Sequence, residues 1–318
     1  MRRTGKSSLV LATLNSMNIN YVYVDVRKVY DDVSKKVTVD KLIDELHSSL
    51  VSLSKKEKLK KALSELEISV ESPLRIRVSK DTFRRVAIKI FDALNGLGKT
   101  VVAFDEAQYL RFSTVGLRPL LAYIYDHLKN ITVILTGSEI GLLHDFAGLE
   151  DPNSELYGRY YKAIEVMPFT RETSEEFLRT GFKQLGADVD QRVIERAADE
   201  LGGIVGWLVY FGKLYQEKGD AALDEVKEVG SRLVKKELDE LFQKSPYYSH
   251  IMKAIAVTGN TRWKNVVDYL VAQTGKNLTN ATISRDLNNL VKMGFIKKEN
   301  GTYHIADPIV RYTLLEKY

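Results

Sequence analysis

The chain of 318 residues contains no cysteine, and this absence excludes several kinds of site. Without thiols there is no disulfide bond, no zinc-thiolate centre and no cysteine nucleophile. The sequence also has no apolar run near the roughly 18 residues needed to span a bilayer, and its first residues lack the apolar block of a secretory signal. We therefore expect a cytoplasmic globular protein with no membrane segment.

The remaining composition is that of a globular chain, with 44% hydrophobic and 28% charged residues. Its length suffices for two or three domains, each with a core of its own. The net charge of +5 is small, so the placement of the charges is more informative than their sum.

Four short apolar runs rich in β-branched residues predict buried strands. They are residues 19–27, 99–108, 131–139 and 162–169. Amphipathic segments alternate with them and predict helices at 6–17, two between 38 and 70, and others at 80–94 and 116–129. This alternation favours an α/β fold in which crossover helices flank a parallel sheet.

The strand pattern ends at Pro168, and an all-helical region follows it. Predicted helices begin near Thr170, Asp190, Gly203 and Asp220. The stretch SPYYSH at residues 245–250 interrupts this series and marks a second boundary. We therefore predict domains at 1–168, 169–244 and 245–318.

The chain opens with MRRTGKSSLV, which has the pattern of the end of a phosphate-binding loop. In such a loop, backbone N–H groups and the start of the next helix surround the phosphates, the lysine neutralises the β- and γ-phosphates, and the hydroxyl ligates Mg²⁺. Gly5, Lys6, Ser7 and Ser8 are therefore candidate ATP-binding residues, and Ser7 is also a candidate Mg²⁺ ligand. By itself, a pattern this short also occurs by chance.

A second motif, VVAFDEAQ, ends a predicted buried strand in two acids. Asp105 could hold the water shell of Mg²⁺, and Glu106 could act as the catalytic base that polarises an attacking water. The alternative is that both acids only cap the next helix. The strand at 131–139 contains TGS, where Thr136 or Ser138 could contact the γ-phosphate or the water. Together, the motifs favour a nucleotide site over helix capping.

Five segments together resemble the archaeal ATPase family of the AAA+/STAND class. They are RRTGKSSL, FDEAQ, LTGSEIGLL, LYGRYYKAIEVMPF and LGGIVGW, in the expected order and spacing. The resemblance covers nearly the whole chain. It implies a P-loop ATPase core at 1–168, a helical lid at 169–244 and a winged helix-turn-helix domain at 245–318. The chain departs from the family at Val205, where a proline is usual, and this change could alter the contacts of the lid.

The family also has a strand and a glycine ahead of the loop, and here they would lie before Met1. Met1 therefore resembles an internal methionine, left by a misassigned start or a genuine truncation. We expect the first core strand to be missing between the strands that end at Thr136 and Val166, which would leave backbone groups unpaired. ATP hydrolysis is expected once that strand is restored.

The resemblance implies roles for further residues. Arg159 matches the place of an arginine finger that reaches the γ-phosphate of a neighbouring subunit in a homo-oligomer; the alternative is an ordinary surface arginine. Arg2 and Arg3 lie within the loop, where they either contact phosphate or project into solvent. Trp207 is expected to anchor a lid helix, and stacking on the nucleotide base is the alternative.

The last predicted domain carries the excess of basic charge. Residues 246–318 contain seven Lys and three Arg against three Asp and two Glu, a net charge of +5. Helices predicted at 248–257, 263–274 and 280–293 precede a two-stranded wing that turns at Asn300-Gly301. In DNA-binding domains of this kind the third helix enters the major groove. The candidate contacts to duplex DNA are Arg285, Asn288, Asn289 and Lys292 on that helix and Lys297 and Lys298 on the wing.

Three functions remain open from the sequence. The first is an ATP-driven switch in which nucleotide binding reorients the lid and the winged helix. The second is a DNA-binding regulator whose degraded ATP site only holds the fold. The third is a defence or mobile-element component whose winged helix docks on a protein partner. Intact Lys6, Asp105 and Glu106 favour the first over the second.

Overall fold

The computed structural model describes residues 1–51, 80–275 and 279–318. They separate into two compact units, one formed by Lys6–Ala163 and the other by Ile164–Tyr318 together with Met1–Gly5. The domain boundaries expected from the sequence, 1–168, 169–244 and 245–318, stay a prediction. None of the helices in the described ranges is long and apolar enough to cross a membrane.

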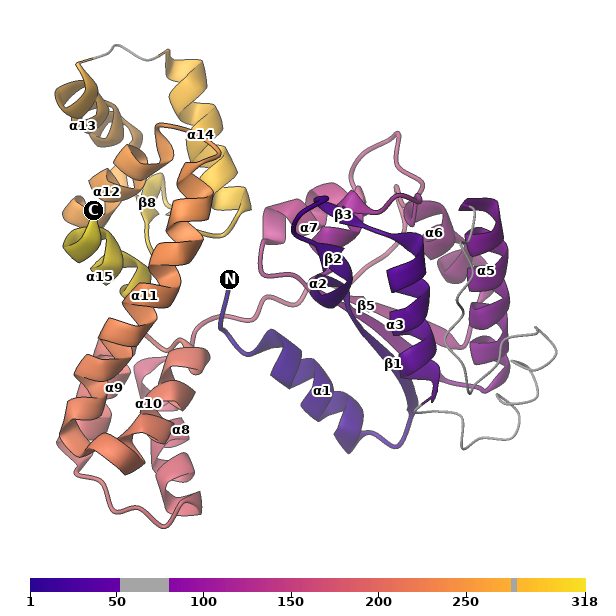
Figure 1. Cartoon of the computed structure of the whole chain (residues 1–318), viewed down its shortest axis with the longest axis horizontal. Coiled ribbons are helices and arrows are strands. Elements are labelled where there is room, and N and C mark those ends of the chain that lie inside the picture. The colour runs from indigo at the N-terminus through magenta and orange to yellow at the C-terminus, as the bar shows by residue number, and fades with distance from the viewer. Residues whose placement is uncertain (52–79, 276–278) are drawn as a thin grey trace. The chain divides into compact units, whose positions relative to one another are not determined.

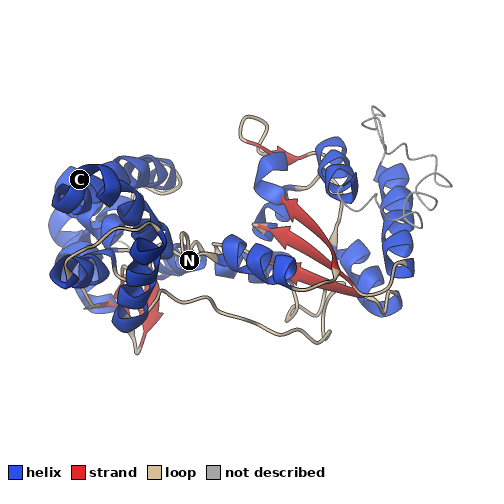
Figure 2. Cartoon of the chain, turned by 90° about the horizontal axis from the view of Figure 1, so that it is seen from below, coloured by secondary structure: helices blue, strands red, loops and turns tan. Residues whose placement is uncertain are grey.

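A three-stranded parallel sheet forms the centre of the unit Lys6–Ala163. β1 (Asn20–Asp25) pairs with β4 (Thr100–Asp105), and β4 pairs with β5 (Ile131–Leu135). The three strands run side by side in Figure 2. The structure confirms the strands predicted around these residues, because continuous β-branched runs suit strands that are buried on both faces, as the central strand β4 is.

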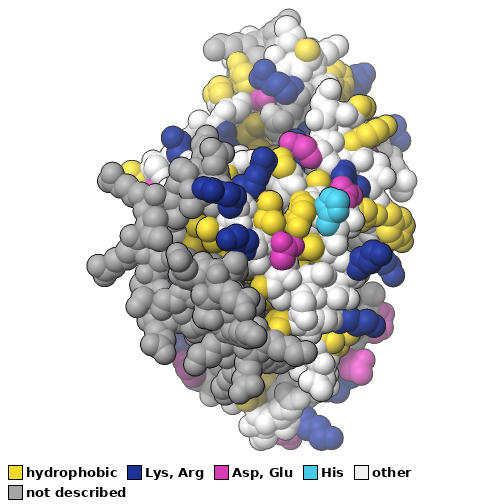
Figure 3. Space-filling model, turned by 90° about the vertical axis from the view of Figure 1, so that its right-hand side faces the viewer, with side chains coloured by type: hydrophobic (Ala, Val, Ile, Leu, Met, Phe, Trp, Pro, Cys, Tyr) yellow, Lys and Arg dark blue, Asp and Glu magenta, His cyan; other side chains and the backbone are white. Residues whose placement is uncertain are grey.

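Three helices pack side by side next to this sheet (Figure 1). They are α3 (Val39–Val51), α5 (Lys80–Gly96) and α6 (Arg118–His127). Val24, Phe91 and Ile124 are fully buried in the hydrophobic cluster that joins helices and strands. On the side of α5 and α6, basic, acidic and apolar side chains are interspersed over the coloured surface in Figure 3.

Shorter elements complete this unit. They are α1 (Lys6–Ser16), α2 (Val26–Val29), the hairpin of β2 (Tyr30–Asp31) and β3 (Lys36–Val37), the 3-10 helix η1 (Ala107–Phe112) and α7 (Ile140–Ala147). η1 follows β4 and α7 follows β5, so both lie at the carboxyl ends of the strands. In open parallel α/β sheets this edge is where ligands bind.

The strand predicted at residues 162–169 is wrong. The segment has no regular secondary structure, and none of the described residues pairs with it in a sheet. A strand is stable only when a neighbour satisfies its backbone groups, and an apolar sequence does not supply that neighbour. Ile164 is 75% exposed as a result. The second helix expected between residues 38 and 70 falls mainly in 52–79, outside the described residues.

Four main helices form the first part of the other unit. They are α8 (Arg171–Gln184), α9 (Gln191–Leu201), α10 (Val205–Lys218) and α11 (Ala222–Phe242), with the short 3-10 helix η2 (Gly219–Ala221) before α11. Helices α8 and α9 begin where the sequence predicts, because the side chains of Thr170 and Asp190 accept hydrogen bonds from N–H groups of the first turn. Leu208 and Phe211 of α10 are fully buried, and α10 packs against α8, α9 and α11.

A winged helix-turn-helix domain follows in the same unit. Its helices are α12 (Tyr248–Thr258), α13 (Trp263–Thr274) and α14 (Asn280–Lys292), and its small sheet has the order β6 (Thr261–Arg262), β8 (Thr302–His304), β7 (Lys297–Glu299). Asn300 and Gly301 both have positive φ angles, 48° and 78°, as a two-residue hairpin turn of type I′ requires. The predicted wing is confirmed.

A last helix, α15 (Pro308–Lys317), was not predicted from the sequence. It begins at Asp307, whose side chain accepts a hydrogen bond from the N–H of Ile309. Helix α15 packs against α11 and α12. It therefore joins the winged helix to the helices that precede it within this unit.

Candidate nucleotide-binding site

Asp105 is the centre of a polar cluster at the carboxyl end of β4. Its Oδ2 accepts a hydrogen bond of 2.6 Å from the Ser7 hydroxyl, in the first turn of α1, and one of 2.5 Å from the Tyr23 hydroxyl of β1. Its Oδ1 accepts a hydrogen bond from the Thr136 hydroxyl, just beyond β5. Three segments far apart in the sequence therefore meet at one carboxylate.

The donors around Asp105 keep it ionised. Burial alone would raise the pKa of the Asp105 carboxyl, but hydrogen bonds from Ser7, Thr136, Tyr23 and the backbone of Glu106 outweigh it and hold that pKa below its ordinary value. Burial and the bond to Asp105 raise the pKa of the Tyr23 hydroxyl well above its usual range. Near neutral pH the cluster therefore has a charged carboxylate and a protonated tyrosine.

The oxygen atoms at this cluster suit Mg²⁺. A magnesium ion bound with a nucleotide takes one or two protein oxygens and fills its other positions with phosphate oxygens and water. The Ser7 hydroxyl and the Asp105 carboxylate lie in contact and could supply two such oxygens. Within the described residues, no group of three or more His, Cys, Asp or Glu side chains could hold a metal ion.

Glu106 follows Asp105 with an unusual backbone. Its φ of 52° lies in the left-handed region, which is uncommon for a residue with a side chain and is often found at functional sites. Its Oε2 accepts three hydrogen bonds: 2.5 Å from Gln108 Nε2, 2.7 Å from the Ser138 hydroxyl and 3.1 Å from the Ser138 N–H. The carboxylate is therefore held at the end of the sheet between η1 and the segment after β5.

The structure brings together most of the residues predicted for the site. Ser7, Asp105 and Thr136 share one network, and Glu106 and Ser138 share another that joins it where the Glu106 N–H donates to the Thr136 hydroxyl at 3.4 Å. Lys6 is the first residue of α1, and Ser8 is exposed on that helix. Gly5 has a φ of 83°, a conformation that favours glycine, and belongs to the other unit.

Two residues of the networks were missed from the sequence. Tyr23 lies within β1, and its contact with Asp105 depends on the parallel pairing of two strands that are far apart in the chain. Gln108 stands in the motif FDEAQ, so a signal was present, but the local pattern alone indicates no chemistry for a glutamine two residues beyond an acid.

Arg159 is held by an ion pair. Its Nη2 lies 2.6 Å from Asp126 Oδ2 and its Nε lies 3.0 Å from Asp126 Oδ1, which is a two-pronged contact. Its guanidinium also lies 5.9 Å from the centre of the Tyr125 ring. The role of Arg159 as an arginine finger stays a prediction, and it would require this ion pair to open.

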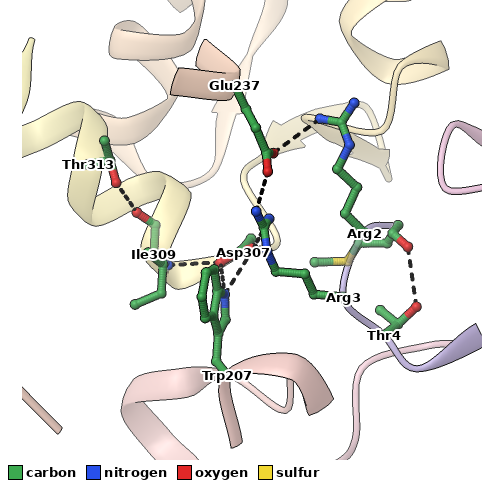
Figure 4. Close-up of polar contacts among 9 residues, drawn as sticks. Arg2, Arg3, Thr4, Trp207, Glu237, Asp307, Ile309 and Thr313 are labelled. Atoms are coloured by element: carbon green, nitrogen blue, oxygen red, sulfur yellow. Dashed lines mark hydrogen bonds and ion pairs between the residues drawn. The ribbon is translucent and has the colours of Figure 1, made fainter. Parts of the chain in front are cut away.

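Arg2 and Arg3 do not project freely into solvent (Figure 4). The Arg3 guanidinium lies 4.6 Å from the centre of the Trp207 ring, pairs with Glu237 of α11, and approaches Asp307 at 3.9 Å. Arg2 lies 3.5 Å from the same glutamate and also stacks at 4.6 Å on a ring of the winged helix, Phe295. Both arginines therefore contact α11 and the C-terminal domain.

Trp207 is an anchor between two parts of its unit. It is only 3% exposed, and its Nε1 donates to both oxygens of Asp307, at 3.0 and 3.2 Å. The carboxyl of Asp307 is nearly enclosed, and burial raises its pKa. The burial of Trp207 favours the helix anchor over stacking on a nucleotide base.

The candidate DNA contacts of the winged helix differ in how far their side chains are exposed. Arg285, Asn288 and Lys292 are exposed and share one face of α14, since they are three and four residues apart. Asn289 is half-buried. The Nζ of Lys297 lies 3.9 Å from Glu165 Oε1, and the lysine side chain is largely covered. Its positive charge is therefore less available to a ligand. Lys298 is exposed, with its ammonium 5.6 Å from the Tyr303 ring.

Comparisons with known proteins agree with this geometry. Residues 1–211 match the model of an ATPase domain found predominantly in Archaea, and residues 243–306 match that of the C-terminal winged helix-turn-helix domain of MCM proteins. The comparison with curated proteins gives no match.

Solved structures resemble this chain over nearly its whole length. The Walker-type ATPase PABY2304 of Pyrococcus abyssi is 40% identical, with a TM-score of 0.84 over 99% of this chain and 89% of that one. The ORC2 protein of Aeropyrum pernix is 11% identical, with a TM-score of 0.55 over 98% of this chain and 84% of that one, and it shows the fold alone. The fold is thus a P-loop NTPase core with a C-terminal winged helix, and the chain belongs to the family of ATPase domains found predominantly in Archaea.

Proposed function

We propose that the protein binds ATP with Mg²⁺, hydrolyses it, and uses the cycle to reposition its winged helix. The contact of 2.6 Å between Ser7 and Asp105 carries the proposal. It joins the last residue of the loop motif to the acid of the second motif across 98 positions of sequence. These are the two side chains that chemistry of this class requires beside one magnesium ion.

Five of the candidate residues have a role in this reaction. The Lys6 ammonium would neutralise the β- and γ-phosphates. Ser7 and Asp105 would hold Mg²⁺, which would supply charge neutralisation as the reaction proceeds. Glu106 takes a proton from the attacking water as that oxygen bonds to the γ-phosphorus. The bond between the γ-phosphorus and the β–γ bridging oxygen breaks at the same time, and ADP leaves with the electron pair. The Thr136 hydroxyl contacts the γ-phosphate or the water.

The contacts of Arg2 and Arg3 support a switch rather than simple hydrolysis. Arg2 and Arg3 lie four and three positions before the loop lysine. Both bind Glu237 of α11 while also contacting Phe295, Trp207 or Asp307. Because the chain is continuous from Arg3 to Lys6, a nucleotide that moves the loop also strains these contacts. The ion pairs then transmit the nucleotide state to the winged helix.

The ORC2 protein of Aeropyrum pernix was solved as ADPNP and ADP complexes, and its fold resembles that of this chain. The 40% identity to the Walker-type ATPase PABY2304 of Pyrococcus abyssi supports a nucleotide as the ligand.

A thermal-shift experiment tests this proposal on the full chain. When the concentration of Mg-ATP is about 100 times its Kd, binding should stabilise the folded state by about 2.7 kcal/mol. For a chain of this size that amounts to a rise in melting temperature of about 4 °C. Omitting Mg²⁺ should reduce the rise, because phosphate charge is then left uncompensated. No rise with Mg-ATP at millimolar concentration would contradict the proposal.

Duplex DNA is the proposed partner of the winged helix. The net charge of +5 in residues 246–318 and the exposed Arg285, Lys292 and Lys298 support it. A DNA-binding regulator that does not hydrolyse ATP is one alternative to the switch. A protein partner remains the second candidate for the winged helix, in a defence or mobile-element component. The covered position of Lys297 against Glu165 favours this alternative at the wing.

The salt dependence of binding separates these partners. With three phosphate contacts, DNA affinity of the full chain should fall on the order of 40-fold between 50 and 200 mM salt. Lys292→Ala should weaken binding to all sequences and flatten the salt slope, whereas Arg285→Ala should also reduce any preference for guanine. Gel-shift titration measures both effects.

Lys218→Ala is the matched control, because it removes an exposed lysine at the end of α10, outside the winged helix. It should leave the salt slope unchanged. Absence of DNA binding at 50 mM salt, or equal effects of Lys218→Ala and Lys292→Ala, would instead favour a protein partner.

A further inference from the structure

Gln108 is the most enclosed polar side chain of the site that has no assigned role. It lies in η1, two residues after Glu106, and is 2% exposed. Its Nε2 donates to Glu106 Oε2 at 2.5 Å and lies 3.4 Å from the Ser138 hydroxyl. Its Oε1 is buried without a hydrogen-bond partner within the described part of the chain. A buried glutamine that leaves one oxygen unsatisfied carries a free-energy cost, which is often retained at functional sites.

Two neighbours fix the orientation of this amide. The Glu106 carboxylate only accepts hydrogen bonds, so the amide nitrogen and not the oxygen must face it. On the other side, a Cβ placed on Gly137 would lie 2.7 Å from Gln108 Oε1. A residue with a side chain at position 137 would therefore require that oxygen to shift. The Gln108 side chain is therefore clamped between the backbone after β5 and the carboxylate.

The hydrogen bonds on Glu106 are distributed unevenly. Oε2 accepts from Gln108 and twice from Ser138, while no hydrogen bond to Oε1 occurs among the described residues. An oxygen that accepts three donors has little capacity left to accept a proton. The other oxygen of the same carboxylate keeps its lone pairs available.

We propose that Gln108 and Ser138 are positioning residues that hold Glu106 by Oε2 and so make Oε1 the atom that accepts the proton of the attacking water. This inference rests on the proposed ATP hydrolysis and assigns the basic oxygen within it. Without the two donors the carboxylate rotates about its terminal bond, and the fraction of time in which an oxygen faces the water falls. Neither residue contacts the nucleotide in this role, so ATP affinity does not depend on them.

Gln108→Met tests the proposal, because methionine has a similar length and volume but cannot donate. The kcat for ATP hydrolysis should fall about 10-fold or more, whereas KM and the Kd for Mg-ATP should change less than about twofold. Gln184→Met, at an exposed glutamine that ends α8, is the matched control and should keep the kcat of the unmodified chain.

A double variant distinguishes positioning through Glu106 from general damage to the fold. In a Glu106→Gln background, Gln108→Met should cause almost no further loss of kcat, since the base through which it acts is absent. The proposal would be overturned if the losses of kcat in Glu106→Gln and Gln108→Met were fully additive in the double variant. Equal changes in kcat and KM in Gln108→Met would also overturn it.

Ser138 supplies a second test that does not depend on Gln108→Met folding. Ser138→Ala should lower kcat with KM unchanged, and Ser138→Thr, which keeps the hydroxyl, should restore most of it. Suppose that Glu106→Gln abolishes hydrolysis but Ser138→Ala and Gln108→Met leave kcat unchanged. That result would overturn the positioning role of Gln108 and Ser138 and leave the proposed function standing. If Glu106→Gln keeps full hydrolysis, the proposed function fails and takes the inference with it.

Discussion

Replacing Glu106 with glutamine should lower the kcat of ATP hydrolysis by a factor of about 10² to 10⁴. The amide keeps the size of the side chain but offers no basic oxygen to the attacking water. Its one carbonyl oxygen can still accept from Gln108 and Ser138, which bind Oε2 of the carboxylate, so that the NH₂ group takes the place of Oε1. Release of phosphate per mole of protein, measured at saturating Mg-ATP, gives the loss directly.

ATP binding should survive this substitution, because Glu106 makes no ion pair with the nucleotide in the proposed reaction. The thermal shift with Mg-ATP should therefore match that of the unmodified chain. Glu150→Gln, an exposed acid in the same unit, is the matched control and should leave kcat unchanged. Hydrolysis by Glu106→Gln at the full rate would remove Glu106 from the mechanism.

Replacing Lys6 with alanine should weaken ATP binding about 100-fold, a loss of ~2.7 kcal/mol. The lysine ammonium is the protein charge closest to the β- and γ-phosphates in a loop of this kind, and alanine leaves that phosphate charge uncompensated. The rise in melting temperature with Mg-ATP should disappear at ligand concentrations that saturate the unmodified chain.

Lys99→Ala controls for the loss of a positive charge, because Lys99 is exposed in the same unit, directly before β4. It should keep the full thermal shift. A normal shift in Lys6→Ala would show that the nucleotide binds without the loop lysine. Lys6→Ala and Glu106→Gln together separate ATP binding from ATP hydrolysis. Only Lys6→Ala should also lose any effect of the nucleotide on DNA binding.

Local patterns in the sequence predicted most of the secondary structure. β1, β4 and β5 were predicted from β-branched runs, and the starts of α8 and α9 were predicted near the capping residues Thr170 and Asp190. The wing was predicted from Asn300-Gly301. These features depend on the preferences of a few adjacent residues, which a single sequence records in full.

The candidate site was predicted in part. The motifs GKS and DEA each consist of adjacent residues, so Ser7, Asp105 and Glu106 are recognisable from the sequence alone. The donors Tyr23 and Gln108 are not, because strand register and burial bring them to the two carboxylates. The strand predicted at 162–169 failed for the related reason that pairing needs a second segment.

The sequence by itself determined most of the helices and strands and indicated Ser7, Asp105 and Glu106 as candidates for nucleotide chemistry, since both depend on neighbours along the chain. Only the tertiary structure decided that Arg3 pairs with Glu237, 234 positions away, that Trp207 is bound to Asp307, and that Gln108 clamps Glu106. The physical reason is that hydrogen bonds and ion pairs depend on distances of about 3 Å, and these are set by how distant segments pack.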